Sequence, residues 1–143
     1  MQPLPHNYVV TARSQQEGDI VLDQGSATRL ISNAPPGFGG PEGYWSPEDL
    51  FVGAVADCFI LTFRAIARAS KLEWQALECS ADGVLDKADG KLQFTGLTIK
   101  AALTVSADVD AAKAERVLHK AEENCLVTNS MKCPVSLEVT VRN

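Results

Sequence analysis

The chain has 143 residues, a formal net charge of −5, 45% hydrophobic residues and 22% charged residues. These totals are typical of a soluble globular protein, and we expect a single domain over 1–143 with one hydrophobic core. The negative net charge and the lack of a Lys/Arg cluster argue against nucleic-acid binding. Residues 1–11 lack the basic start and apolar centre of a signal peptide, so the expected location is the cytoplasm.

The first part of the chain, 1–45, is predicted to contain short strands followed by a loop. The predicted strands are 8–12, 20–22 and 28–31, the last two joined by a turn at 23–26. The loop is rich in proline and glycine and has three aromatic residues in or next to it, namely Phe38, Tyr44 and Trp45. These side chains either cap the core or form the wall of an apolar pocket, and the sequence leaves both interpretations open.

A long helix is predicted over 46–70. Ser46 is a favourable N-cap, Pro47 suits the first helical position, and Asp49 suits the first turn. The following residues are apolar on every face of the helix, which is typical of a buried helix or a membrane span. Because the run is short and contains Asp57 and Arg64, we expect a central core helix and no membrane association.

The last part of the chain, 74–143, is predicted to hold a hairpin, a second helix and a final strand. Strands are expected at 74–85 and 92–105, with an irregularity near Gly96, followed by a helix from 108 or 110 to 124 and a strand at 135–141. This order of elements predicts an α+β fold with antiparallel sheets packed around the buried central helix.

There are four cysteines, Cys58, Cys79, Cys125 and Cys133. None is paired as CxxC, which argues against a zinc site, and the chain is too long and apolar to need a disulfide framework. Free cysteines often only fill space in a core. Cys79 is expected to fill space in the core, because it lies on the apolar side of its strand. Cys133 is a spare thiol, a competing partner in disulfide formation, or neither.

Two segments resemble the OsmC/Ohr superfamily, the osmotically inducible and organic hydroperoxide resistance proteins. The first, Phe38–Phe59, has a Gly-rich loop, a Ser-Pro-Glu helix start and Cys58 ten residues after Glu48. The second, Ala121–Val135, places Cys125 just after the late helix. Both the content and the spacing of the two motifs agree with that superfamily.

The resemblance implies an intertwined homodimer and a thiol peroxidase that reduces organic hydroperoxides and, in some branches, hydrogen peroxide. Cys58 would attack the peroxide and Cys125 would resolve the product as a disulfide. The reductant would be a dithiol, in several members a lipoylated protein. Such chemistry needs no metal, flavin or haem.

In the peroxide-reducing members, an arginine from the N-terminal strands activates the cysteine and is held by the glutamate that matches Glu48. That arginine position falls near Gln15 or Gln16 here. The closest basic residue is Arg13, Arg29 is further off, and Arg64 in the core helix is another possible cation. Asp57 also departs from the family pattern, because a carboxylate beside Cys58 disfavours the thiolate.

These two departures favour an alternative function. The chain would then be a non-enzymatic module that binds an apolar small molecule or partner. The pocket would be lined by Phe38, Tyr44, Trp45 and Phe59.

Overall fold

A computed structural model describes residues 1–143, which form two compact units, Met1–Leu50 and Phe51–Asn143. The long helix α1 (Pro47–Ala69) begins in the first unit and continues in the second. The expectation of one domain stays a prediction.

The N-terminal unit contains a three-stranded antiparallel sheet. Its strands are β1 (Thr11–Arg13), β2 (Ile20–Asp23) and β3 (Leu30–Ser32), in the order β1-β2-β3. A short 3₁₀ helix, η1 (Pro36–Phe38), follows in the loop. The three predicted strands are confirmed, but the first lies at 11–13 and not at 8–12. The reason is that β2 is short, and its last residue, Asp23, already pairs with Thr11.

Helix α1 begins at a capping box. The Ser46 hydroxyl accepts a hydrogen bond from the Asp49 backbone N–H at 3.1 Å, and the Asp49 carboxylate accepts one from the Ser46 N–H at 3.0 Å. This reciprocal pair satisfies backbone donors that a helix start otherwise leaves free. At the other end, Lys71 adopts φ 51° and the Leu72 N–H bonds to the Ala67 carbonyl, which closes the helix. The predicted start of the helix is confirmed.

The C-terminal unit contains a second sheet, in the order β4-β5-β6. Strands β4 (Ala76–Ala88) and β5 (Lys91–Thr104) form an antiparallel hairpin. Strand β6 (Val135–Arg142) runs parallel to β5, so the expectation of purely antiparallel sheets is wrong here. Helix α2 (Ala111–Glu123) lies between the two strands in sequence and supplies the crossover that a parallel pair requires.

The predicted irregularity near Gly96 is a bulge in the hairpin. Val84 pairs with Gly96, whereas the next residue, Leu85, pairs with Phe94. Thr95 is therefore the extra residue, and its hydroxyl donates to the Val84 carbonyl at 3.3 Å.

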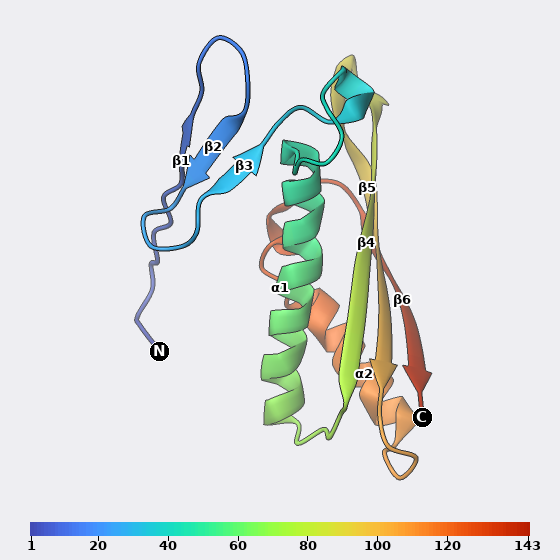
Figure 1. The fold of residues 1–143 in the computed structure, drawn as a ribbon. Coiled ribbons are helices and arrows are strands. Elements are labelled where there is room, and N and C mark those ends of the chain that lie inside the picture. Colours follow the sequence, from blue (N-terminus) through green and yellow to red (C-terminus); the bar gives the residue numbers. More distant parts are fainter. The chain divides into compact units, whose positions relative to one another are not determined.

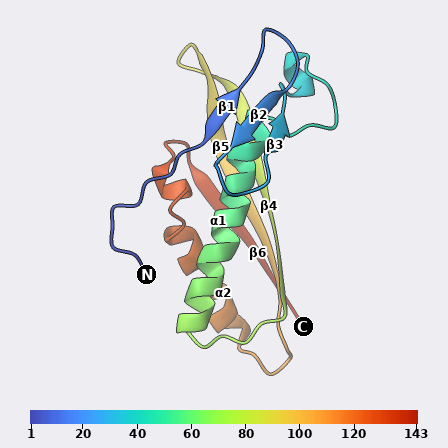
Figure 2. The ribbon, with the colours of Figure 1, turned by 60° about the vertical axis from the view of Figure 1, so that its left-hand side comes forward.

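Both helices of this unit contribute to one core with the same face of the sheet (Figures 1 and 2). The buried residues recur at helical spacing on α1 and α2 and at every second position of β5. They are Val55, Phe59, Phe63 and Ala67 on α1, Ala114, Val117, Leu118 and Ala121 on α2, and Leu97, Ile99, Ala101 and Leu103 on β5.

Helix α1 is buried along one stripe, although its sequence is apolar on every side. Phe51 is 38% exposed and Leu61 54% exposed. By length and composition alone α1 could cross a membrane, a test that core helices also pass. The structure therefore confirms an α+β fold with α1 in its core, and the exposed side of α1 carries Leu61 beside the exposed Asp57, Arg64 and Arg68.

Candidate active site

Cys58 lies on α1 at the edge of the buried stripe. Its neighbour Phe59 and the preceding Val55 are fully buried, and this fixes the rotation of the helix. Cys58 is consequently half-buried. A reactive cysteine needs such partial exposure, whereas a fully buried one is inert.

Cys125 follows the end of α2 and is fully buried. Its carbonyl accepts hydrogen bonds from the Thr128 hydroxyl at 3.1 Å and from the Asn129 N–H at 3.0 Å. Its own N–H donates to the Glu122 carbonyl at 3.2 Å. These bonds hold the residue in the tight turn that leads into η2 (Thr128–Ser130).

The structure brings Cys58 and Cys125 together, although they are far apart in the sequence. Burial raises the pKa of the Cys125 thiol, hydrogen bonds from Thr128 lower it, and the adjacent Cys58 thiol raises it further. Cys58 must therefore lie within interaction range of Cys125. Two neighbouring thiols are the groups that thiol–disulfide exchange requires.

A third thiol lies near this pair. Cys79 is on β4, paired with Ala101 of β5, and is partly buried against the core. Burial raises its pKa to about 11, and the Cys125 thiol adds to that shift. Cys79 is thus a protonated, weakly nucleophilic neighbour at neutral pH.

The other cysteine, Cys133, lines a separate shallow pocket of about 250 Å³. Phe51 and Phe94 also line it, with their rings stacked at a centroid distance of 4.7 Å. All four cysteines are free thiols.

Thr62 contacts the Cys58 sulfur and was missed from the sequence. Its Oγ1 lies 3.9 Å from Cys58 Sγ, one helical turn further along α1. The signal that could have found it is the spacing of four residues, which places two side chains on the same side of a helix.

Glu48 lies in the first turn of α1, as predicted. Its Oε2 atom is buried and has no hydrogen-bond partner. A buried carboxylate oxygen without a donor is energetically costly, so this position suits a cationic donor supplied from elsewhere.

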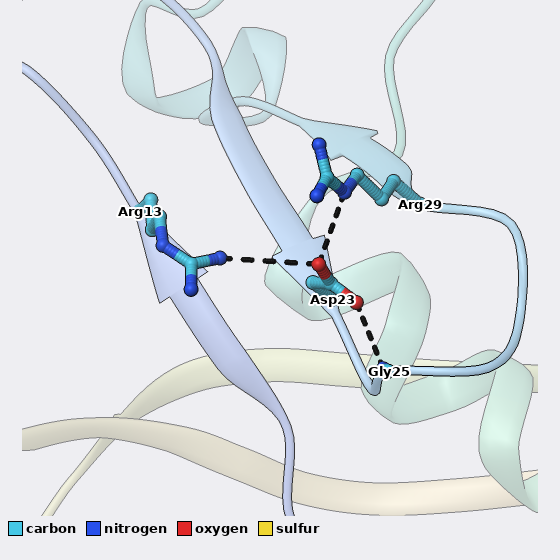
Figure 3. Close-up of polar contacts among 4 residues, drawn as sticks. All are labelled: Arg13, Asp23, Gly25 and Arg29. Atoms are coloured by element: carbon cyan, nitrogen blue, oxygen red, sulfur yellow. Dashed lines mark hydrogen bonds and ion pairs between the residues drawn. The ribbon is translucent and has the colours of Figure 1, made fainter.

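Arg13 does not supply that donor in this structure, because it pairs with Asp23. The Asp23 carboxylate lies 3.9 Å from Arg13 and 3.0 Å from Arg29, between the two guanidinium groups, and it also accepts a hydrogen bond from the Gly25 N–H at 2.8 Å (Figure 3). The Gly25 hydrogen bond and then the Arg29 guanidinium hold the pKa of Asp23 below its ordinary value. Asp23 was not singled out from the sequence, which shows only an acid in a turn.

The four predicted pocket residues differ in their surroundings. Phe38, Tyr44 and Trp45 are exposed, and the Trp45 carbonyl is tied to the Asn33 N–H at 3.0 Å. Phe59 is instead fully buried in the core, because it belongs to the stripe of α1 that faces the sheet. In this structure Phe59 is a packing residue and presents no surface to a ligand.

The structure thus has an α+β scaffold with one free thiol on its long helix and another just after its second helix. The chain belongs to the OsmC-like protein family, whose sequence profile matches residues 39–140.

Two sequence relatives match the chain over most of its length. The peroxiredoxin OsmC of Escherichia coli is 25% identical over 134 residues, which cover 89% of this chain and 92% of that protein. The uncharacterized protein YmaD of Bacillus subtilis is 25% identical over 138 residues, which cover 94% and 91%.

Solved structures show the same fold. An OsmC-like protein of unknown function from Vibrio cholerae superposes with a TM-score of 0.85 at 19% identity, covering 95% of this chain and 100% of its own. The organic hydroperoxide resistance protein OhrB of Bacillus subtilis gives a TM-score of 0.69 at 24% identity, covering 96% and 98%. The family thus includes proteins named for peroxide reduction and for hydroperoxide resistance.

Proposed function

We propose that this chain is a thiol-dependent peroxidase that reduces organic hydroperoxides through Cys58 and Cys125. The observation that carries the proposal is the closeness of a half-exposed thiol and a buried thiol inside the C-terminal unit. The names of the relatives, peroxiredoxin and organic hydroperoxide resistance protein, agree with this class of reaction.

The proposed reaction has three steps. The Cys58 thiolate attacks one peroxide oxygen, the O–O bond breaks, and the leaving alkoxide takes a proton to become the alcohol while Cys58 becomes a sulfenic acid. The Cys125 sulfur then attacks the sulfenic sulfur, the S–O bond breaks, and the oxygen leaves with the Cys125 proton as water. An external dithiol reduces the Cys58–Cys125 disulfide and is itself oxidised to a disulfide.

The buried position of Cys125 suits the resolving role. A buried thiol with a raised pKa stays protonated and does not compete for peroxide. It reacts once the sulfenic acid forms beside it, because the attack is then intramolecular. This division of roles protects Cys58 from further oxidation to sulfinic acid.

Glu48 and an arginine of the N-terminal unit are proposed to complete the site. The unpaired Glu48 oxygen can accept from a guanidinium, and a cation near Cys58 would favour its thiolate. Arg13 is the proposed donor, with its guanidinium exchanged from Asp23 to Glu48. Arg13→Gln should then lower the peroxidase rate, whereas an unchanged rate would remove Arg13 from the mechanism.

A homodimer is proposed from the exposed side of α1. Leu61 is 54% exposed there, beside the exposed charges of Asp57, Arg64 and Arg68, and its apolar side chain is more stable against a second apolar surface than in water. Light scattering should show a dimer at micromolar concentration. Leu61→Glu should shift the protein toward monomer, whereas the charge reversal Lys120→Glu on the solvent-exposed side of α2 should not. A wild-type monomer would contradict the proposal.

The reductant and the location follow from the same chemistry. The proposed reductant is a dithiol, and the proposed class includes lipoylated proteins. Four free thiols suit a reducing compartment, which supports the cytoplasm.

The decisive experiment treats the reduced protein with one equivalent of cumene hydroperoxide and maps the thiols by non-reducing peptide mass analysis. We expect the loss of two thiols and one intramolecular Cys58–Cys125 disulfide. Cys58→Ser should abolish dithiol-dependent peroxide consumption, Cys125→Ser should lead to over-oxidised Cys58, and Cys133→Ser should behave as wild type. Undiminished turnover by Cys58→Ser would show the proposal to be wrong.

A second candidate is a non-enzymatic module that binds an apolar small molecule. The exposure of Phe38, Tyr44 and Trp45 in and beside the loop rich in glycine and proline favours it. Ligand binding that persists in a variant lacking both thiols, together with no peroxide turnover by the wild type, would support this candidate.

A further inference from the structure

Cys58 has one polar side chain beside it on its own helix. The side chains that neighbour a helical residue lie three and four positions before and after it. For Cys58 these positions are occupied by Ala54, Val55, Leu61 and Thr62. Thr62 alone carries a hydrogen-bond donor, so the helix itself offers the sulfur a single hydroxyl.

The structure places that hydroxyl against the sulfur. Thr62 Oγ1 lies 3.9 Å from Cys58 Sγ, and both side chains are half-buried. A threonine within a helix often bonds instead to the carbonyl of the residue four positions earlier, which here would be Cys58. The contact that the Thr62 hydroxyl makes is with the Cys58 sulfur and leaves the helical hydrogen bonding of that turn undisturbed.

Two other thiols lie on the elements near this sulfur. The Cys125 thiol interacts with it from the segment after α2, and Cys79 on β4 lies beyond Cys125. Asp57, the neighbour in sequence, is exposed. None of these three donates a hydrogen bond from a positive charge, so the Thr62 hydroxyl is a donor of a different kind from its neighbours.

We propose that Thr62 is a positioning residue for the Cys58 thiolate, donating its O–H to the sulfur and orienting it for attack. The proposal rests on the proposed thiol chemistry. Thr62 exchanges no proton and no electron: Cys58 loses its proton to solvent, the thiolate accepts the Thr62 hydrogen bond, and the hydroxyl keeps its proton throughout. Its contribution is to lower the free energy of the anion in its reactive orientation.

The matched pair of variants is Thr62→Val, which keeps the shape and removes the hydroxyl, and Thr62→Ser, which keeps the hydroxyl. The measurement is the rate of Cys58 alkylation by iodoacetamide against pH, followed on the Cys58 peptide by mass spectrometry. Thr62→Val should shift that profile so that alkylation at about pH 7 is about fivefold slower, the effect expected for the loss of one hydrogen bond. Thr62→Ser should follow the wild type.

A profile of Thr62→Val that coincides with the wild type would overturn the proposal. If Thr62→Val melts earlier than the wild type by circular dichroism, Thr62→Ala, which favours a helix and also lacks the hydroxyl, provides the same comparison. The result is separable from the peroxidase assay. A shifted profile without peroxide turnover supports the role of Thr62 and counts against the proposed function, whereas turnover with an unshifted profile does the reverse.

Discussion

The reactivity of Cys79 tests whether the structure makes its thiols chemically different. Burial and the nearby Cys125 raise the pKa of Cys79 from 9.0 to about 11. Each pKa unit changes the thiolate fraction tenfold, so at about pH 8 the folded protein should hold about 100-fold less Cys79 thiolate than the unfolded chain. Cys79 should therefore react very slowly in alkylation and disulfide exchange, although it lies near Cys125.

The assay compares alkylation of the Cys79 peptide by iodoacetamide in buffer and in urea. We expect a rate at least about 100-fold lower in buffer at about pH 8, with the pH profile rising toward pH 11. Cys133, which lies in a different pocket, serves as the internal control. Alkylation of Cys79 in the folded protein at the rate of the unfolded chain would refute the reasoning.

The same shift predicts how stability depends on pH. The unfolded chain loses the Cys79 proton near pH 9.0 and the folded chain near pH 11, so the folded state binds more protons between these values. The free energy of unfolding should then fall as pH rises from about 9 to about 11. Because the Cys79 side chain is only half-buried, we expect the free energy of unfolding to fall by roughly 1 kcal/mol, which is less than the whole pKa shift would give. Cys79→Ser should lose this part of the pH dependence.

Three further predictions concern the scaffold and are measured as free energies of unfolding in urea. Phe59→Ala removes a fully buried ring and should cost about 3–5 kcal/mol, whereas a loss below about 1 kcal/mol would contradict its place in the core. Ser46→Ala removes the N-cap and should cost about 1 kcal/mol, with Ser46→Thr close to wild type. Gly83→Ala should cost about 1–3 kcal/mol, because its Cβ would lie 2.7 Å from Val52 and 2.8 Å from Phe94; a neutral result would show that these side chains move aside.

Local signals explain which features were predictable. The start of α1 follows from Ser46, Pro47 and Asp49, because a capping box involves residues three positions apart. The alternation in β6 follows from the period of two in a strand. The motif spacing likewise placed Cys58 on a helix and Cys125 after a helix.

The site could be predicted only in part. The pairing of Cys58 with Cys125 came from a resemblance, and the sequence alone did not indicate that Cys79 would lie near the same pair. Asp23 was missed because Arg13 reaches it from β1 and Arg29 from the residue before β3. Phe59 was expected in a pocket, and only the rotation of α1 shows that it points into the core.

The sequence by itself determined the elements, their caps and the positions of the reactive residue types, since these depend on contacts within a few residues. The tertiary structure decided the parallel direction of β6, the stripe of α1 that is buried, and the closeness of two thiols from distant segments. These features depend on strand pairing and side-chain packing between segments far apart in the chain. Many arrangements satisfy the same local pattern, and the packed core selects one of them.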